Sequence, residues 1–221
     1  MSLWVKICAN TLLEDALLAA DAGADAVGFI FAPSPRRVTV AQVAEITPKL
    51  PEKLEKIGVF VDTPVAEITK AIRAAGLTGV QLHAEIDASA AAQLRDEFGP
   101  ALKILRVVHF GSEAAAQAAA FAKDRNIDAI LIDSRTATAV GGTGIAFDWQ
   151  EARETIFGPG STAKFIAAGG LNPANVAEAI ATLRPWGVDV ASGVEAGPGR
   201  KDAAKVRDFV GNARAAIAYR Q

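Results

Sequence analysis

One short stretch restricts the fold of this chain most narrowly: Ile166-Ala167-Ala168-Gly169-Gly170-Leu171-Asn172-Pro173. Its apolar start is typical of a short buried strand, and the two glycines then end that strand. Asn172 suits the N-cap of a helix and Pro173 its first position, so the stretch predicts a strand, a tight turn and a helix in direct succession. Glycines let a backbone pass close to a ligand, and the free N–H groups at a helix start favour an anion such as phosphate.

A second turn of the same kind follows one unit later. The apolar run 188–191 also reads as a buried strand, and Ser192-Gly193 ends it. A single turn of this kind is weak evidence, whereas two turns at the ends of consecutive strands are informative. In closed eight-stranded α/β barrels the phosphate site lies after strands 7 and 8. We therefore predict a phosphate cradle formed by Gly169, Gly170, Ser192 and Gly193.

Outward from these turns, strand-like and helix-like segments alternate over the whole chain. The apolar runs are continuous, which is typical of buried parallel strands, and the alternation implies right-handed crossovers. The predicted strands are 4–8, 25–31, 56–61, 79–82, 102–108, 129–132, 164–168 and 187–191; the predicted helices are 12–22, 40–50, 64–76, 88–98, 112–125, 149–156, 173–183 and 202–219. The longest loop after a strand, 134–147, contains Gly141-Gly142-Thr143-Gly144, and we expect it to act as a lid.

Eight such units in 221 residues predict an α/β fold, a single (β/α)8 TIM barrel domain spanning residues 1–221. The alternative is a doubly wound open sheet. Such sheets usually carry their glycine fingerprint after the first strand, and here no glycine precedes Gly23.

Composition excludes several classes of protein. The net charge is −2 without a basic block, which argues against a nucleic-acid partner. The apolar runs are too short to span a membrane and the N-terminus lacks the layout of a signal peptide. One cysteine and two histidines argue against a disulfide framework and a zinc site. We expect a cytoplasmic enzyme that is either monomeric or homodimeric.

Candidate catalytic residues follow from the barrel, because its chemistry sits at the carboxyl ends of the strands. Cys8 ends the first strand, and Lys6, two residues earlier, points to the same face. A nearby ammonium favours a thiolate, which could act as a base. The alternatives are that Cys8 is a small buried hydrophobe and that Lys6 only neutralises inward carboxylates. Asp133 ends the sixth strand, across the mouth from Cys8, where it could act as an acid unless it merely caps a turn.

Other polar residues at strand ends are candidates for binding. Arg36 and Arg37 lie in a proline-framed loop, where a guanidinium could grip a substrate carboxylate or simply be solvated. His83 follows the fourth strand and has a structural alternative; His109 we take as structural. Asp189 lies inside the eighth strand and must face the barrel interior and be paired. Together with the cradle, this set predicts a phosphorylated small molecule that also bears an anionic group.

With these residues assembled, the chain resembles the phosphoribosylanthranilate isomerase family of tryptophan biosynthesis. The resemblance runs in register from Val5 to the last helix, and no single motif is decisive. Its carriers are Val5-Lys6-Ile7-Cys8, residues 23–31, Ser34-Pro35-Arg36-Arg37, 58–61, Val80-Gln81-Leu82-His83, Ile130-Leu131-Ile132-Asp133, 141–144 with Phe147-Asp148-Trp149, 169–176, 188–195 and 198–202.

The resemblance implies an Amadori rearrangement of N-(5′-phosphoribosyl)anthranilate to a 1-deoxyribulose 5-phosphate adduct, without a cofactor. By similarity, Asp133 is the general acid that protonates the furanose ring oxygen, and Cys8 is the general base that removes the C2′ proton. Arg37 matches the arginine that grips the anthranilate carboxylate. Gly170, Ser192 and Gly193 match the phosphate cradle.

Two positions depart from the family pattern, and two other functions remain open. The family usually reads Lys-Ile-Cys-Gly and Gln-Leu-His-Gly, but Ala9 and Ala84 replace the two glycines here. If Ala9 needs a positive φ, alanine costs on the order of 1 kcal/mol there.

A histidine-pathway type of sugar-phosphate isomerase is one alternative function, although such enzymes usually have an aspartate base on strand 1. A non-catalytic phosphate-binding barrel is the other.

Overall fold

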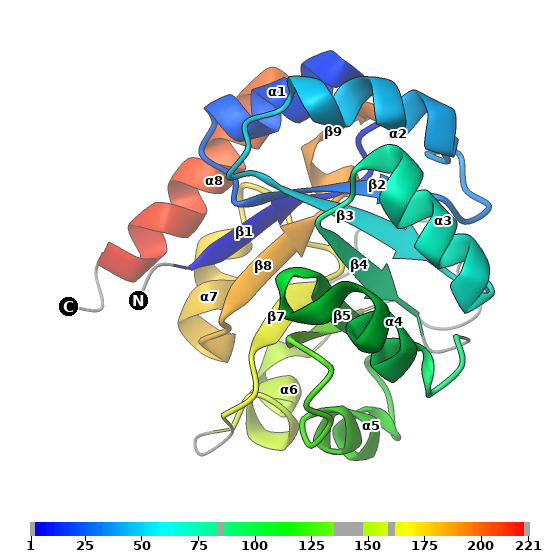
Figure 1. Ribbon diagram of the computed structural model, residues 1–221. Coiled ribbons are helices and arrows are strands. Elements are labelled where there is room, and N and C mark those ends of the chain that lie inside the picture. Colours follow the sequence, from blue (N-terminus) through cyan, green and yellow to red (C-terminus); the bar gives the residue numbers. More distant parts are fainter. Residues whose placement is uncertain (1–2, 84–85, 135–147, 159–161, 219–221) are drawn as a thin grey trace.

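A computed structural model describes residues 3–83, 86–134, 148–158 and 162–218. Within these residues eight parallel strands close a barrel in sequence order (Figure 1). Because β1 pairs with both β2 and β8, the predicted (β/α)8 barrel is confirmed and the open sheet is excluded. The strands are β1 (Trp4–Ile7), β2 (Ala26–Ile30), β3 (Glu55–Phe60), β4 (Gly79–Leu82), β5 (Lys103–His109), β6 (Ala129–Asp133), β7 (Phe165–Ala168) and β8 (Gly187–Val190).

A helix follows each strand, and the helices surround the barrel in Figure 1. Local sequence explains several ends: Thr39 and Gln42 form a capping box at the start of α2, and Gly76 ends α3 in a left-handed conformation. Among the described residues, no helix combines the length and apolar character that a membrane crossing needs. The helices are α1 (Leu13–Asp21), α2 (Val40–Ile46), α3 (Val65–Ala75), α4 (Ala90–Phe98), α5 (Ala114–Phe121), α6 (Trp149–Thr155), α7 (Val176–Leu183) and α8 (Ala203–Ala218).

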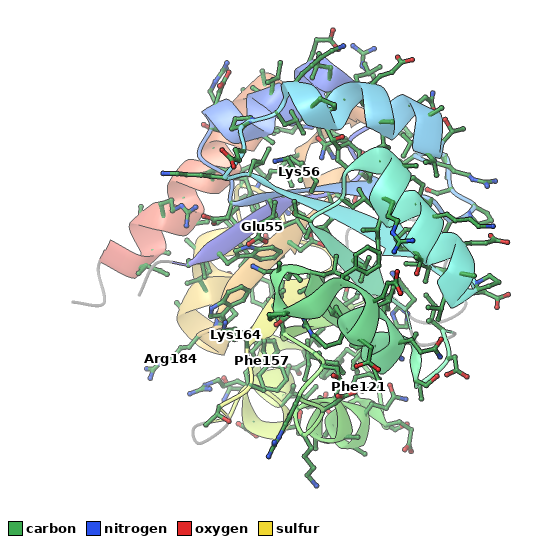
Figure 2. All side chains as sticks on the ribbon, in the orientation of Figure 1. Glu55, Lys56, Phe121, Phe157, Lys164 and Arg184 are labelled. Atoms are coloured by element: carbon green, nitrogen blue, oxygen red, sulfur yellow. The ribbon has the colours of Figure 1, made fainter. Side chains whose placement is uncertain are left out.

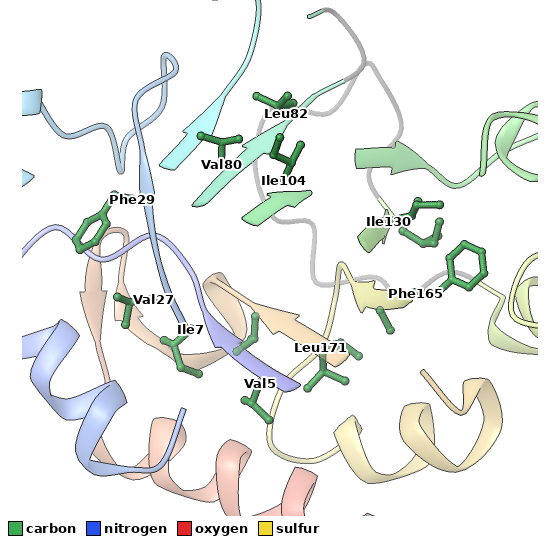
Figure 3. Close-up of a cluster of buried hydrophobic side chains, with 14 of the residues drawn as sticks. Val5, Ile7, Val27, Phe29, Val80, Leu82, Ile104, Ile130, Phe165 and Leu171 are labelled. Carbon is green, nitrogen blue, oxygen red and sulfur yellow. The ribbon is translucent and has the colours of Figure 1, made fainter. Parts of the chain in front are cut away.

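Alternating side chains along each strand divide the core into two layers. Figure 3 shows outward-facing residues such as Val5, Ile7, Val27 and Phe29, which belong to the large apolar cluster between strands and helices. The inward-facing positions form a smaller apolar cluster that includes Leu105, Leu131 and Ile166. Lys6, Gln81 and Asp189 are buried as well. Since Lys6 and Asp189 hydrogen-bond to one another, the interior contains charge that must be satisfied locally.

Side chains close the amino-terminal end of the barrel. Trp4 stacks on Trp186 with ring centroids 5.3 Å apart, and the Lys103 ammonium lies 5.4 and 5.5 Å from the two rings. Lys103 also pairs with Glu55, which is labelled in Figure 2. This filled end favours stability, so a ligand has to enter at the opposite, carboxyl end of the strands.

Two local predictions were wrong. α7 begins at Val176 rather than at Pro173, because Asn172 and Asn175 bond across an intervening turn: Asn172 N donates to Asn175 Oδ1 at 2.8 Å. Between β8 and α8, where the sequence predicts neither strand nor helix, lie the 3₁₀ turn η3 (Ser192–Val194) and a hairpin of β9 (Glu195–Gly197) and β10 (Arg200–Lys201). The predicted lid 134–147 lies outside the described residues except for Ser134.

Candidate active site

A hollow opens at the carboxyl ends of the strands and gathers most of the predicted site residues. It contains Asp133, Asp189 and all four cradle residues, from β6, β8 and the turns after β7 and β8. Side chains of Arg36 and Ser34 reach it from the loop after β2. The full lining is Ile30, Ser34, Arg36, Asp133, Ser134, Ala168, Gly169, Gly170, Leu171, Asp189, Val190, Ala191, Ser192 and Gly193.

The two turns of the cradle interlock in a way that only glycine permits. Gly169 and Gly170 have φ of 82° and 67°, in the left-handed region. A Cβ on Gly193 would lie 1.9 Å from the Leu171 carbonyl oxygen, and one on Gly169 would lie 2.6 Å from Asp133 Oδ1. Because α7 begins only at Val176, a phosphate in this cradle would meet the backbone N–H groups of the turns rather than a helix start.

The Asp133 carboxyl group lies beside this cradle at the end of β6. The residue is only 4% exposed, and its backbone oxygen accepts a hydrogen bond from Phe110 N at 2.9 Å. A Cβ added to Gly169 would lie 2.6 Å from Oδ1, so the carboxyl group lies beside the first turn of the cradle. A carboxyl group in this position can give a proton to a sugar whose phosphate occupies the turns.

Lys6 is committed to groups inside the barrel. Its fully buried ammonium donates to Asp189 Oδ1 at 3.0 Å and to Gln81 Oε1 at 2.9 Å. Burial by itself would lower the pKa of Lys6, but Asp189 and Cys8 outweigh this effect and the pKa is raised. The prediction that Asp189 faces inward and is paired is confirmed, and Lys6 neutralises it.

Cys8 lies between residues that line the hollow on β8 and β2. Its N–H donates to Val190 O at 2.8 Å, and Sγ lies 2.6 Å from where a Cβ on Gly28 would be. Burial raises the pKa of the Cys8 thiol; Lys6 counteracts this and Asp189 adds to it, and the net shift is upward. Lys6 thus lowers the pKa of Cys8, as its nearby charge predicts, but burial and Asp189 outweigh this effect in the free protein.

We expect this raised pKa to be visible in the alkylation of Cys8, the only cysteine in the chain. Iodoacetamide reacts with the thiolate, so the rate should rise about tenfold per pH unit and keep rising above the ordinary cysteine pKa. Replacing Lys6 with methionine should move the curve to still higher pH. Mass spectrometry measures the rate; a plateau below the ordinary pKa would mean that Lys6 does activate the thiol.

Comparisons with known proteins agree with this arrangement. The profile of the family described as N-(5′-phosphoribosyl)anthranilate (PRA) isomerase matches residues 5–212. The N-(5′-phosphoribosyl)anthranilate isomerase of Pelobacter propionicus is 42% identical over 207 residues, 93% of each chain. The chain belongs to the N-(5′-phosphoribosyl)anthranilate isomerase family.

Solved structures of this family have the same fold. A phosphoribosylanthranilate isomerase in complex with reduced 1-(o-carboxyphenylamino)-1-deoxyribulose 5-phosphate aligns with a TM-score of 0.79 at 33% identity, covering 96% of this chain and 99% of that one. Monomers generated from the dimeric isomerase of Thermotoga maritima align with a TM-score of 0.78, also at 33% identity and with the same coverage.

The side chains of the two neighbouring arginines, Arg36 and Arg37, line different hollows. Arg36 lines the hollow, whereas Arg37 is exposed and lines a different hollow with Phe31, Asp62 and Lys70, between the loops after β2 and β3. Arg36 lies in a turn after β2, and Arg37 follows it where the backbone bridges to Ile30. Arg36, and not Arg37, therefore shares a hollow with Asp133 and the cradle.

Arg36 is oriented by Glu195 from the β9–β10 hairpin. Arg36 Nε donates to Glu195 Oε1 at 2.8 Å and Nη2 donates to Oε2 at 2.7 Å. These hydrogen bonds raise the pKa of Arg36 despite its partial burial. A guanidinium has five N–H donors, so this pairing leaves the Nη1 side available for a ligand carboxylate.

The backbone of the Cys8-Ala9 turn has a conformation that suits glycine, the residue that the isomerase family usually has at the position of Ala9. Ala9 is fully buried with φ of 64°, so the suspected positive φ is confirmed. Ala84, the second departure, lies outside the described residues.

The two histidines do not line the hollow that contains the cradle. His83 is buried at the end of β4, and its ring centroid lies 5.6 Å from that of His109.

Sequence reasoning missed Glu195 and Lys201 as parts of the site. Both are buried, and the Lys201 ammonium lies 3.5 Å from Glu195 Oε1. Burial favours a raised pKa at Glu195, but Arg36 and Lys201 hold it below the usual range. The Gly197-Pro198-Gly199 turn between charged residues could have indicated a hairpin.

Among the described residues, no group of three or more His, Cys, Asp or Glu side chains could hold a metal ion.

Proposed function

We propose that this chain isomerises N-(5′-phosphoribosyl)anthranilate to 1-(2-carboxyphenylamino)-1-deoxyribulose 5-phosphate in tryptophan biosynthesis. The observation that carries the proposal is one hollow with an acid, a guanidinium and two glycine turns: Asp133, Arg36 and the cradle. Each part suits one group of this substrate, namely the sugar ring, the anthranilate carboxylate and the phosphate. Membership of the isomerase family supports the same substrate.

In the proposed reaction, Asp133 gives its proton to the furanose ring oxygen. The bond between that oxygen and C1′ breaks, and the anthranilate nitrogen supplies the electron pair that forms the imine. The Cys8 thiolate then removes the proton from C2′, giving an enolamine. Protonation of C1′ and loss of the hydroxyl proton at C2′ give the ketone, so that the sequence is a net isomerisation.

The test is turnover of freshly generated phosphoribosylanthranilate, followed by the loss of its fluorescence. Turnover by the purified protein supports the proposal. Binding of inorganic phosphate without turnover would instead support the non-catalytic barrel. Turnover of a histidine-pathway substrate, with none of this one, would support the other isomerase, although Cys8 occupies the position where that class usually has aspartate.

We expect the two neighbouring arginines to differ in their effect on this reaction. Arg36→Gln should lower kcat/KM by about 10- to 100-fold, because a charge-assisted contact to the substrate carboxylate is lost. Arg37→Gln, the matched control, should stay within about threefold of the native value. Steady-state kinetics measure both, with urea unfolding to confirm that each variant is folded. The reverse order would restore the role to Arg37.

Two further proposals concern the whole molecule. Residues 1–221 form one barrel domain, a proposal supported by ring closure between β1 and β8. The protein is a monomer or a homodimer; a family member from Thermotoga maritima is dimeric. Sedimentation velocity at micromolar concentration distinguishes the two states.

A further inference from the structure

The β9–β10 hairpin places a buried ammonium group directly behind Cys8. The Lys201 side chain is fully buried, and Nζ lies 2.6 Å from the Cys8 carbonyl oxygen, 3.2 Å from that of Ala191 and 3.5 Å from Glu195 Oε1. An ammonium group has three N–H donors, and each has an acceptor here. Through this one ammonium group, Lys201 therefore connects the end of β1, the end of β8 and the hairpin.

Other contacts fix the hairpin to the segment that follows β1. The Lys201 N–H donates to Asp15 Oδ2 at 3.1 Å, and Thr11 Oγ1 donates to Gly199 O at 2.6 Å. Glu195, in the same hairpin, holds Arg36. Since both ends of Lys201 are held, its ammonium group can fix the Cys8 carbonyl in one place.

The turn that Lys201 contacts is strained. Ala9, whose N atom is bonded to the Cys8 carbonyl carbon, has φ of 64°, a conformation that residues other than glycine disfavour. Asn10 holds the far side of the turn: its Nδ2 donates to Ile7 O at 2.8 Å and its N–H donates to Gly28 O at 2.9 Å. A strained turn persists only where its surroundings hold it, and Lys201 holds the near side.

We propose that Lys201 is a positioning residue for the general base, which keeps the strained Cys8-Ala9 turn in the conformation that aims the thiol at the substrate. The inference rests on the proposed function. Proton removal requires close approach of base and carbon, and a displacement of about 1 Å can cost about 100-fold in rate. Lys201 acts through the Cys8 backbone, without touching the reacting atoms.

Lys201→Met tests this role, because it keeps most of the apolar stem and removes the ammonium group. We expect kcat to fall about 10- to 100-fold, with KM changing by less than about fivefold. Lys205→Met is the control: Lys205 is exposed on α8 and its Nζ bonds the Glu195 backbone oxygen at 2.9 Å, away from Cys8. It should stay within about threefold of the native kcat.

A double-mutant cycle with Ala9→Gly distinguishes positioning from general support. Glycine adopts the left-handed turn without the alanine penalty. The factor by which Lys201→Met lowers kcat should therefore be at least about threefold smaller in the Ala9→Gly background than in the native one. A merely structural lysine would cost the same factor in both backgrounds. Equal factors, or an unchanged kcat in folded Lys201→Met, would overturn the inference.

Two outcomes keep this test separate from the proposed function. If the native protein does not turn over phosphoribosylanthranilate, the proposed function fails and the inference falls with it. If the native protein is active, only the inference is at stake. Should Lys201→Met not fold, Lys201→Gln, which keeps an amide donor, is measured in both backgrounds with the same two expected results.

Discussion

Asp133→Asn is expected to lower kcat by roughly 10²–10⁴-fold, because asparagine keeps the shape of the side chain but has no carboxyl proton to give. The loss should fall on kcat more than on KM, since the cradle and Arg36 remain in place. Steady-state fluorescence kinetics measure both constants. In the structure the side chain lies over Gly169, so an isosteric amide should fit without moving the cradle.

Asp62→Asn is the matched control for this prediction. Asp62 also follows a strand of the barrel, β3, but it does not line the hollow that holds the cradle. Its φ is 46°, and asparagine tolerates that conformation well. Its kcat should stay within about threefold of the native value. An Asp133→Asn enzyme as active as the Asp62→Asn enzyme would remove Asp133 from the mechanism.

Cys8→Ser should lower kcat by a similar factor, roughly 10²–10⁴-fold, because a serine hydroxyl ionises far less readily than a thiol and its basic form is scarcely populated at accessible pH. Serine is close in size to cysteine, so it should occupy the space above Gly28 that the thiol now fills. If the cradle is intact, inorganic phosphate should inhibit the variant at the same concentrations at which it inhibits the native enzyme.

Alkylation gives an independent check on the same residue. Because Cys8 is the only cysteine, incorporation of a single label can be compared directly with loss of activity in the native enzyme. The two should proceed at the same rate, and product should slow both. Native turnover in Cys8→Ser, or full activity in the labelled protein, would contradict the role of Cys8 as the base.

The raised pKa of Cys8 matters for how the base works. In the free protein the thiol is buried, and burial together with the Asp189 charge outweighs the lowering effect of Lys6 on its pKa. The thiolate that the proposed mechanism requires is therefore the minor form in the free protein near neutral pH, and its geometry has to be correct whenever it forms. This makes the fixed turn at Cys8-Ala9, and the contacts that hold it, more important for the rate than the resting ionisation of the thiol.

The sequence by itself determined the barrel, the end of it that carries the chemistry, and the family. Continuous apolar runs alternating with amphipathic segments leave few folds, and two glycine turns after the last strands predict a phosphate site. Cys8, Asp133, Asp189 and the cradle could be named because strand ends are visible as the points where apolar runs stop.

Only the tertiary structure decided which arginine faces the hollow, what Lys6 does and where the hairpin lies. Arg36 and Arg37 are neighbours in sequence, but Arg36 pairs with Glu195, 159 positions away, and lines the hollow of the cradle, whereas Arg37 lines another. Lys6 meets Asp189, 183 positions away, and Lys201 meets Cys8, 193 positions away. Such contacts depend on closure of the barrel, which brings β1 beside β8, and local patterns carry no record of them.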